Sequence, residues 1–543
     1  MDNHREGEPM AVAEENTGAA AGTVVLDPKR DRLVITASSL GTVFEWYDFF
    51  VYGILAALIG KLFFPSDNAA AATLASLAVF GAGFAVRPVG AVVFGYLGDK
   101  IGRKYTFLIT ITLMGGATAA IGLLPTFAQA GLWAAGLLVF LRCLQGLALG
   151  GEYGGAAIYV AEHAPKGKRG QYTSWIQASV AGGFLLAVCV VLATRSAMST
   201  EAFEAWGWRV PFLISIILLA ISLWIRLMLS ESPVFKAMKE AGTVSKNPFL
   251  DSFRYPGNVK RILVAMFGVA AGLTVIYYTS QFGTLYFLTG TARVPETDAL
   301  GYMAIGALLA APLYVAAGWL SDHFGRKRIL LIGYALTMIG TFPLFHMMAD
   351  AANPALAEAS RNNPVVLTLP ENCEFNPLAS KQTTPCAQAL AFLAKRGLSH
   401  SKAEGQDVSL SVGGATVAGF DEKGYVAALE AAGYPDKSDP AQRQSWIIII
   451  TVALLVALSA MTYGQVAAIL VEMFPAKIRY TSLSIPYHIG TGYFGGFLPF
   501  ISQYIVAKTG GTFNGLWYTV GVVAMAFIVS LIWLPENKDK ELD

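Results

Sequence analysis

The chain contains long apolar stretches that recur from end to end, and these stretches limit its possible folds more than any other feature. A helix that crosses the hydrocarbon core of a bilayer needs about 20 mostly apolar residues. Twelve stretches reach that length, and they lie near 35–62, 71–97, 105–124, 131–160, 172–195, 207–229, 262–288, 299–320, 329–349, 445–470, 481–507 and 514–534. We therefore expect an all-α polytopic membrane protein with twelve transmembrane helices in two six-helix bundles.

The composition supports a membrane protein and argues against several other classes. Hydrophobic residues make up 55% of the 543-residue chain and charged residues only 14%, which is too apolar for a soluble protein of this length. A net charge of +2 gives no reason to expect a nucleic-acid partner. The four cysteines and six histidines are scattered, without metal-ligand spacing. We find no nucleophile–base arrangement or phosphate loop, and we expect neither an enzyme nor a metal site.

Basic residues cluster in alternate loops and so predict the orientation. Cytoplasmic loops carry an excess of Lys and Arg, and here these residues precede the first stretch and follow the second, fourth, eighth and tenth stretches, as well as filling the centre of the chain. Both termini are therefore predicted to be cytoplasmic, in the inner membrane. The expected organisation is a disordered tail (1–30), an N-terminal bundle (31–229), a cytoplasmic linker (230–261), a C-terminal bundle (262–349 and 445–534) and a cytoplasmic tail (535–543).

A charged turn occurs twice and indicates an internal duplication. The first copy follows the second stretch and the other follows the eighth, at an offset of 318 − 95 = 223 residues. A further repeat, after the fourth and tenth stretches, has an offset of 472 − 162 = 310 residues. All these elements are predicted on the cytoplasmic face, where their charges would form a gate: Gly95, Asp99, Gly102, Arg103, Lys104, Glu162, Arg169, Asp322, Gly325, Arg326, Glu472 and Arg479.

The two offsets differ by 310 − 223 = 87 residues, which predicts an insertion between the ninth and tenth helices. The polar, proline-containing segment 350–444 fits that insertion, and its position in the topology places it outside the cytoplasm. Cys373 and Cys386 both lie in this segment, where a disulfide would persist. The alternative is two free thiols in a loose loop.

Several motifs resemble those of the major facilitator superfamily. The doubled turn has the pattern G-x-x-x-D-x-x-G-R-K. A narrower resemblance, to the metabolite:proton symporter family, rests on Gly41-Thr-Val-Phe-Glu45-Trp46-Tyr47-Asp48, Arg87-Pro88, Arg142-Cys-Leu-Gln145-Gly146 and Gly150-Gly-Glu152-Tyr153. That family includes carriers for α-ketoglutarate, citrate, shikimate and proline or betaine. The resemblance implies uptake of a small metabolite coupled to proton entry, with the proton as coupling ion and no other cofactor. The insertion departs from the family pattern.

Ionisable residues within the first and fourth apolar stretches are candidates for proton coupling. Glu45 and Asp48 share one helical face with Tyr52, and carboxylates that face lipid would be costly, so they should line the interior. Arg142 and Gln145 form a second polar stripe, and a rise of about 1.5 Å per residue places Arg142 and Asp48 near the same depth. A carboxylate that pairs with Arg142 in one state and is protonated in another would supply the coupling. A structural ion pair is the alternative.

Other polar residues in the apolar stretches are candidate substrate contacts. Glu152 is a further proton-site candidate, and Arg87 would bind an anion, pair with a carboxylate or reach the cytoplasmic surface. The second half contributes uncharged groups, each of which would equally serve as helix packing. The full substrate-site set is Tyr47, Tyr52, Arg87, Arg142, Gln145, Tyr277, Tyr278, Gln281, Tyr487 and His488.

The leading functional hypothesis is a monomeric, proton-coupled importer of a small organic acid or zwitterion that works by alternating access. The alternatives are an exporter or uniporter of the same superfamily, and a membrane sensor that uses the insertion to bind a ligand without transporting it.

Overall fold

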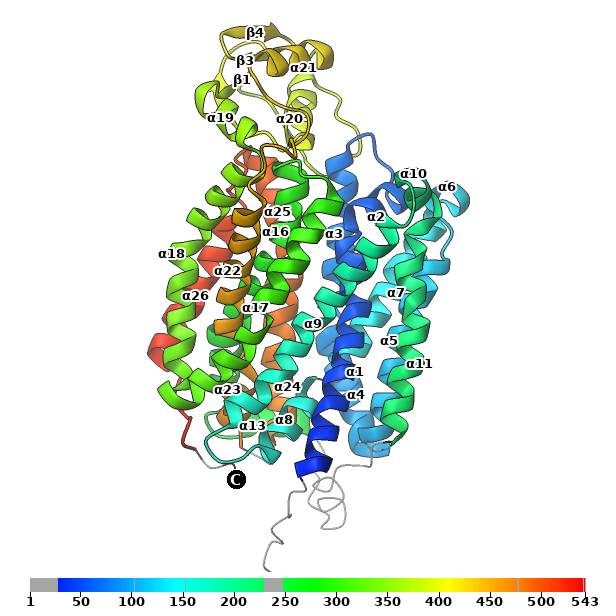
Figure 1. Cartoon of the computed structure of the whole chain (residues 1–543), viewed down its shortest axis with the longest axis vertical. Coiled ribbons are helices and arrows are strands. Elements are labelled where there is room, and N and C mark those ends of the chain that lie inside the picture. The colour runs from blue at the N-terminus through cyan, green and yellow to red at the C-terminus, as the bar shows by residue number, and fades with distance from the viewer. Residues whose placement is uncertain are drawn as a thin grey trace, which may run out of the picture.

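The computed structural model describes residues 28–228 and 248–542, except Gly102, Glu152, Ala476, Lys477 and Glu541. Most of the predicted N-terminal tail (1–27) and the first part of the predicted linker (230–247) lie outside these residues. The described chain is mainly helical, with one small sheet (Figure 1). It forms two helical halves and one α/β unit.

The N-terminal half begins at Pro28, slightly before the predicted start of its bundle. Its elements are α1 (Pro28–Ile54), α2 (Ala56–Phe63), α3 (Ala69–Ala85), α4 (Arg87–Ile101), α5 (Arg103–Leu123), α6 (Phe127–Ala130), α7 (Leu132–Gly150), α8 (Tyr153–His163), α9 (Arg169–Ser196), α10 (Thr200–Ala202), η1 (Phe203–Gly207) and α11 (Arg209–Met228). The first predicted span is broken, because α1 and α2 meet at an angle of 61°.

The C-terminal half contains several short π-helical segments, labelled η. Its elements are α13 (Pro248–Arg254), α14 (Asn258–Leu263), η2 (Val264–Ala270), α15 (Ala271–Tyr278), η3 (Thr279–Gly283), α16 (Thr284–Tyr286), η4 (Phe287–Thr291), α17 (Glu296–Phe324), α18 (Arg326–Ala352), α22 (Ser445–Tyr463), α23 (Val466–Met473), α24 (Arg479–Ile489), η6 (Gly490–Gly496), α25 (Leu498–Thr509) and α26 (Leu516–Trp533). Part of the predicted linker is therefore helical.

Membrane-crossing length is reached by many of these helices. Within the described residues, nine helices are long and apolar enough to cross a bilayer, and the number rises to eleven if each of two bent pairs counts as one span. The two bent pairs are α1 with α2, and α10 and η1 with α11. The chain is thus a membrane protein with several spanning helices.

Close backbone packing holds the N-terminal half together at glycines of α3, α4 and α7. A Cβ atom at Gly146 would lie 1.7 Å from the carbonyl oxygen of Gly83, and one at Gly90 would lie 2.0 Å from that of Leu147. One at Gly150 would lie 2.1 Å from the carbonyl oxygen of Arg87. Small residues allow such approach between helices in lipid. This contact fixes α7 against the helices that carry the candidate site.

The two halves meet along α9 and α17, which run antiparallel. At one end of the pair, Gly170 and Gly318 bring the two backbones together, since a Cβ at Gly318 would lie 2.5 Å from the carbonyl oxygen of Gly170. At the other end, Arg195 of α9 forms an ion pair of 2.8 Å with Glu296 of α17. The contact between α9 and α17 is therefore held at both ends of the helix pair.

The segment between α18 and α22 folds as an α/β unit with its own core. Its elements are α19 (Pro354–Asn362), β1 (Val365–Leu369), α20 (Pro385–Lys395), β2 (His400–Glu404), β3 (Ser409–Val412), β4 (Ala415–Ala418) and α21 (Glu422–Ala431). The sheet order is β2-β1-β3-β4, with β1 parallel to β2 and the other neighbours antiparallel. Alternate residues of β1 are buried, so one face of the sheet covers the core and the other faces outward. A disulfide joins Cys373 to Cys386.

The α/β unit caps one end of the helical bundle, and the C-terminus lies at the opposite end, where α1 also begins (Figure 1). We call these the unit end and the terminal end.

Gly146 offers a test of the glycine packing on α7. We expect Gly146→Ala to lower the thermal unfolding midpoint of the purified protein, because the added methyl group must displace the backbone of α3, and overpacking typically costs about 1–3 kcal/mol. Gly136→Ala on the same helix is the matched control, since a Cβ there meets no atom within 4 Å. Equal midpoints for the two variants would contradict this packing.

Candidate functional site

Helix α1 carries the acidic candidates into the protein interior. The side chain of Asp48 is 4% exposed and accepts a hydrogen bond from the Ser215 hydroxyl of α11. Tyr47 donates from its hydroxyl to the carbonyl oxygen of Pro211 on α11. The hydroxyl of Tyr52, one turn further along α1, lies 3.2 Å from the Ser76 hydroxyl of α3. The helix therefore presents its polar groups to neighbouring helices of its own half.

Glu45 lies one turn before Asp48 on α1 and is also buried. Its burial agrees with the expectation that both carboxylates of this helix avoid lipid. Glu152, the third acidic candidate, is outside the described residues.

Arg142 of α7 is fully buried in a cage of aromatic rings. Its guanidinium carbon lies 4.2 Å from the ring centre of Phe49, 4.4 Å from that of Tyr52 and 5.2 Å from that of Phe80. Its Nη1 atom donates to Gln145 Oε1 at 2.6 Å. Cation–π contacts of this kind stabilise a desolvated cation by about 2 kcal/mol.

The expected ion pair between Asp48 and Arg142 is absent from this conformation. The amide nitrogen of Gln145 donates to the Thr118 hydroxyl at 2.6 Å and approaches the backbone carbonyl of Asp48 at 3.4 Å. The two helices do meet at the predicted level, but Arg142 contacts the backbone of α1 while the Asp48 carboxylate turns toward Ser215. Ser215 therefore takes the place of Arg142 at the Asp48 carboxylate, and Gln145 takes the place of Asp48 at Nη1 of Arg142. Within the described residues, Nε and Nη2 of Arg142 have no hydrogen-bond partner.

Arg87 is the first residue of α4 and is also fully buried. Its guanidinium carbon lies 5.5 Å from the ring centre of Trp46, 5.2 Å from that of Phe84 and 6.0 Å from that of Tyr487. Tyr487 belongs to the C-terminal half, so this cation lies where the halves meet. Among the described residues, no group makes a hydrogen bond to any of its three side-chain nitrogens, so the predicted carboxylate partner is not seen there.

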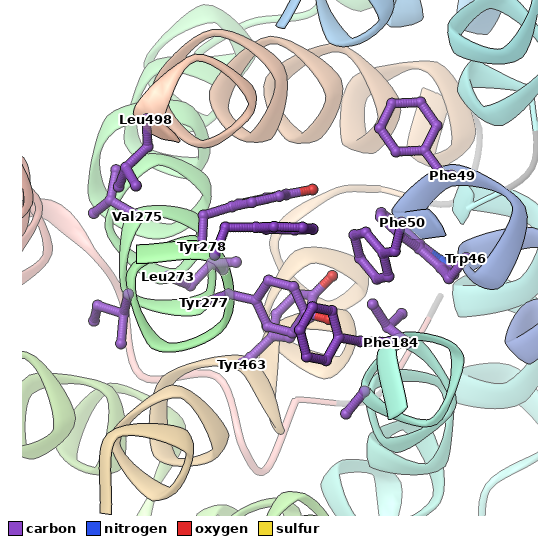
Figure 2. Close-up of a cluster of buried hydrophobic side chains, with 14 of the residues drawn as sticks. Trp46, Phe49, Phe50, Phe184, Leu273, Val275, Tyr277, Tyr278, Tyr463 and Leu498 are labelled. Atoms are coloured by element: carbon purple, nitrogen blue, oxygen red, sulfur yellow. The ribbon is translucent and has the colours of Figure 1, made fainter. Parts of the chain in front are cut away.

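The C-terminal half places uncharged polar groups opposite these cations. Tyr487 of α24 stacks on Tyr153 of α8 with ring centres 3.7 Å apart, and its hydroxyl lies 2.9 Å from that of Tyr463 on α22. Tyr277 and Tyr278 project from α15 toward Phe50 of α1, as Figure 2 shows. The predicted aromatic and polar residues of both halves therefore converge on one interior region.

Several of these groups are buried without a hydrogen-bond partner within the described part of the chain. They are the hydroxyls of Tyr277 and Tyr278, the side-chain amide of Gln281 and both ring nitrogens of His488. Buried polar groups are normally hydrogen-bonded. The unsatisfied hydroxyls of Tyr277 and Tyr278 belong to the aromatic cluster that also contacts Arg87 and Arg142, and they are therefore suited to bind a polar ligand.

Sequence reasoning missed the groups that hold the candidates in place. Ser215 is one of two serines in α11, with Ser222, and nothing in the sequence distinguishes it as the partner of Asp48. Tyr463 and Gln177, which contact Tyr487 and Tyr153, had no distinguishing signal either. The aromatic cage around Arg142 depends on tertiary contacts between α1, α3 and α7.

A charge network joins the two halves at the terminal end. Glu472 of α23 is fully buried and accepts from Arg169 of α9 at 2.8 Å and from Arg326 of α18 at 3.1 Å. Arg479 of α24 pairs with Glu162 of α8 at 2.9 Å. Two of these contacts, Arg169 with Glu472 and Arg479 with Glu162, link the N-terminal half to the C-terminal half.

Asp322, from the second copy of the charged turn, belongs to the same network. Its carboxylate accepts from the backbone nitrogens of Gly170 and Gln171 at 2.8 Å each, and from Arg326 at 2.6 Å. Gly325 follows with a φ of 105°, a conformation that glycine adopts readily. The second charged turn is therefore part of the charge network at the terminal end.

The first copy of the turn is described only in part. Gly95 faces Tyr480 of α24, which a Cβ at Gly95 would approach to 3.6 Å. Gly102 and the side chains of Asp99, Arg103 and Lys104 lie outside the described residues. Their predicted part in a gate stays a prediction.

The segment after α26 also docks on this network. Glu536 accepts from the backbone nitrogens of Arg326 and Lys327 at 2.9 and 3.0 Å. Lys540 accepts a hydrogen bond from Arg169 through its carbonyl oxygen. The predicted C-terminal tail is thus bound to the bundle over these residues.

Comparisons with known proteins agree with this architecture. A family model described as sugar (and other) transporter matches residues 33–250 and 424–543, which is more than half of the chain. A model described as MFS/sugar transport protein matches residues 155–366. Most of the α/β unit lies outside the first match.

Curated relatives are transporters. The shikimate transporter of Escherichia coli is 39% identical over 331 residues, which cover 60% of this chain and 74% of the relative. The alpha-ketoglutarate permease of Escherichia coli is 32% identical over 64% of this chain and 78% of its own length. The proline/betaine transporter of Salmonella typhimurium is 36% identical over 59% of this chain and 65% of its own length.

Solved structures share the fold. The crystal structure of a D-xylose–proton symporter has a TM-score of 0.60 at 18% identity and covers 94% of this chain and 100% of its own. A partially occluded inward-open form of the xylose transporter from E. coli has a TM-score of 0.59 at 17% identity, with coverage of 94% and 99%. At such low identity these matches concern the fold alone.

Fold and buried site together define a membrane transporter built from two helical halves. The family and relative matches identify it further: the chain belongs to the sugar (and other) transporter family, within the major facilitator superfamily.

Glu472 offers a test of the network at the terminal end. We expect Glu472→Gln to weaken the contact between the halves, because Arg169 and Arg326 would lose a buried carboxylate, and breaking a buried pair costs about 3–5 kcal/mol. Distances between spin labels on the terminal ends of the two halves should then show a longer population. Arg361→Gln is the control, because it breaks an exposed pair with Asp350, whose contribution should be below about 1 kcal/mol. Identical distance distributions in both variants would contradict the role of Glu472.

Proposed function

We propose that this protein is a secondary active transporter that carries a small carboxylate or zwitterion, together with protons, into the cell by alternating access. The observation that carries the proposal is the buried Arg87 guanidinium at the junction of the two halves, without a hydrogen-bond partner among the described residues. A guanidinium binds a carboxylate through two parallel hydrogen bonds, so a carboxylate ligand fits this site.

The polar groups of the C-terminal half would complete the ligand site. Tyr277, Tyr278 and Gln281 offer unsatisfied donors and acceptors, and the aromatic rings around them would hold an apolar or cationic part of a zwitterion. Shikimate, α-ketoglutarate, proline and betaine appear in the names of the relatives, and each of these compounds has a carboxylate group. The proposed substrates are therefore small carboxylates, with or without a positively charged group in the same molecule.

Asp48 is the proposed proton carrier. Its carboxyl group is buried, it faces Ser215 and not a cation, and its helix contacts Arg142 through the backbone. A rotation of α1 against α7 would bring the carboxylate to Arg142, and a proton would replace that cation when the two groups separate. Alternation between these two arrangements would couple proton entry to the rocking of the halves.

The membrane topology is part of the proposal. The run formed by α24, η6 and α25 would supply the twelfth span, in addition to the eleven described above. The basic residues of the terminal end favour a cytoplasmic position for that end, so the α/β unit would lie outside, at the inner membrane of a bacterium. In this conformation the cytoplasmic side is closed by the charge network.

Uptake by reconstituted protein tests the proposal. Proteoliposomes should accumulate at least one of labelled shikimate, α-ketoglutarate, proline and glycine betaine when an inward proton gradient is imposed, and a protonophore should abolish the accumulation. Uptake that persists unchanged after the gradient collapses would contradict proton coupling.

Asp48→Asn should abolish proton-driven accumulation while exchange of labelled for unlabelled substrate continues. The amide keeps the shape of the carboxyl group, but it does not bind and release a proton near neutral pH. Asp350→Asn, at an exposed ion pair, is the matched control and should accumulate substrate normally. Normal accumulation by Asp48→Asn would remove this residue from the coupling role.

Arg87→Lys keeps the positive charge but loses the planar pair of donors, so we expect at least a tenfold rise in the substrate concentration needed for half-maximal uptake. An unchanged concentration dependence would show that Arg87 does not bind the carboxylate.

A further inference from the structure

The α/β unit is fixed to the C-terminal half at many points. It continues from α18 and leads into α22, so both of its connections belong to that half. Arg293, which precedes α17, donates to the carbonyl oxygens of Arg396 and Pro435. His400 donates from its backbone nitrogen to the carbonyl oxygen of Gly510 at 3.1 Å. The unit and the C-terminal half should therefore move together.

One loop of the unit also reaches the N-terminal half. This loop lies between Cys373 and Cys386, whose disulfide closes it. Ser66 and Asn68, in the connection between α2 and α3, donate to the carbonyl oxygen of Ser380 at 3.1 and 3.2 Å. We call the contact of Ser66 and Asn68 with residues 377–380 the outer latch.

Asn68 is the centre of the outer latch. Its side-chain nitrogen donates to the carbonyl oxygens of Pro377 and Ala379 at 3.5 and 3.4 Å. Its side-chain oxygen has a separate task, because it accepts from the backbone nitrogen of Ala70 and so caps α3. The side-chain nitrogen of Asn68 thus belongs to the latch, while its side-chain oxygen caps the helix.

The same loop is held from the opposite side by the C-terminal half. Lys508 of α25 donates to the carbonyl oxygen of Phe375 at 2.5 Å, two residues before Pro377. The disulfide loop therefore bridges the two halves across the unit end. The halves must separate at this end whenever the central site opens outward.

The outer latch has the properties of a contact that opens and closes. Its hydrogen bonds from Asn68 and Ser66 all end on backbone carbonyls, and those from the side chain of Asn68 are long. A cavity of about 240 Å³ lies within the contact, lined by residues of both sides such as Asp67, Lys381 and Glu422. The hydrogen bonds from Arg293 and Lys508 that anchor the unit to the C-terminal half are shorter, at 2.9 and 2.5 Å.

We propose that the α/β unit is an external latch that moves with the C-terminal half and holds the outward side closed through Ser66 and Asn68. The proposal rests on the proposed function, because it assumes that the unit end faces outward and opens during transport. Release of the outer latch would accompany outward opening, and its formation would favour the closed arrangement described here. The unit would thereby set the fraction of time that the outward site is open.

Asn68→Asp tests the latch without removing the helix cap. The variant keeps the oxygen that caps α3 but replaces the donor nitrogen by an oxygen that repels the carbonyls of Pro377 and Ala379. Asn363→Asp is the matched control, because Asn363 also donates from its amide to a backbone carbonyl, that of Ala432, but within the unit. Both variants add one negative charge.

Distances between spin labels at Glu201→Cys and Thr509→Cys would report opening between the halves at the unit end. The background should carry serine at Cys143 and Cys189 and retain the disulfide. We expect Asn68→Asp to gain a longer-distance population that Asn363→Asp lacks. Unchanged distances in Asn68→Asp, or the same gain in both variants, would overturn the proposal.

Cross-linking supplies a second, functional test. Oxidation of the pair Ser66→Cys and Ser380→Cys should lower substrate uptake at least tenfold relative to the same protein before oxidation. The pair Ser411→Cys and Thr416→Cys, whose hydroxyls lie 3.1 Å apart within the unit, is the control and should transport normally when oxidised. Normal uptake by the cross-linked Ser66 and Ser380 pair would overturn the latch.

These two readouts separate the latch from the proposed function. If the wild-type protein showed no proton-dependent uptake, the proposed function would fail, and the spin-label distances would still decide whether the outer latch restrains the halves.

Discussion

A charged side chain inside a bilayer must be paired, hydrogen-bonded or neutralised, and the rest of this structure depends on that constraint. Glu472 satisfies it through two arginines, Arg142 through an amide and three rings, and Asp48 through one hydroxyl. The first solution is an ion pair that resists separation. The contact of Asp48 with a single hydroxyl leaves a carboxyl group whose charge depends on whether it holds a proton. A proton-coupled transporter requires such a group.

The helix packing converts these local contacts into motion of whole halves. Glycines of α3, α4 and α7 join these three helices backbone to backbone, so Arg87 and Arg142 move as one body. The contacts between the halves are more varied. They are ion pairs and the close approach of Gly170 and Gly318 at the terminal end, stacked aromatic rings in the middle, and the Arg195–Glu296 ion pair with hydrogen bonds to backbone at the unit end. The hydrogen bonds and ion pairs among them can be exchanged for hydrogen bonds to water when the halves separate.

The sequence predicted the membrane class, the two halves and most of the residues that meet in the interior. It could do so because apolar length, helical periodicity and the doubled charged turn are local signals. The partners of those residues were not predictable, because the Ser215 contact with Asp48 and the rings around Arg142 come from other helices. The sequence also predicted a separate segment between α18 and α22, while its sheet and its contact with Ser66 and Asn68 depend on tertiary packing that no short pattern encodes.

The central claim is that substrate and proton enter together because Asp48 alternates between a proton and Arg142. Simultaneous recording of substrate uptake and internal pH, with a pH dye trapped in proteoliposomes, tests this claim most directly. With no imposed proton gradient, an inward substrate gradient should acidify the interior for the wild-type protein and leave the pH unchanged for Asp48→Asn. Substrate entry through the wild-type protein without acidification would contradict the account.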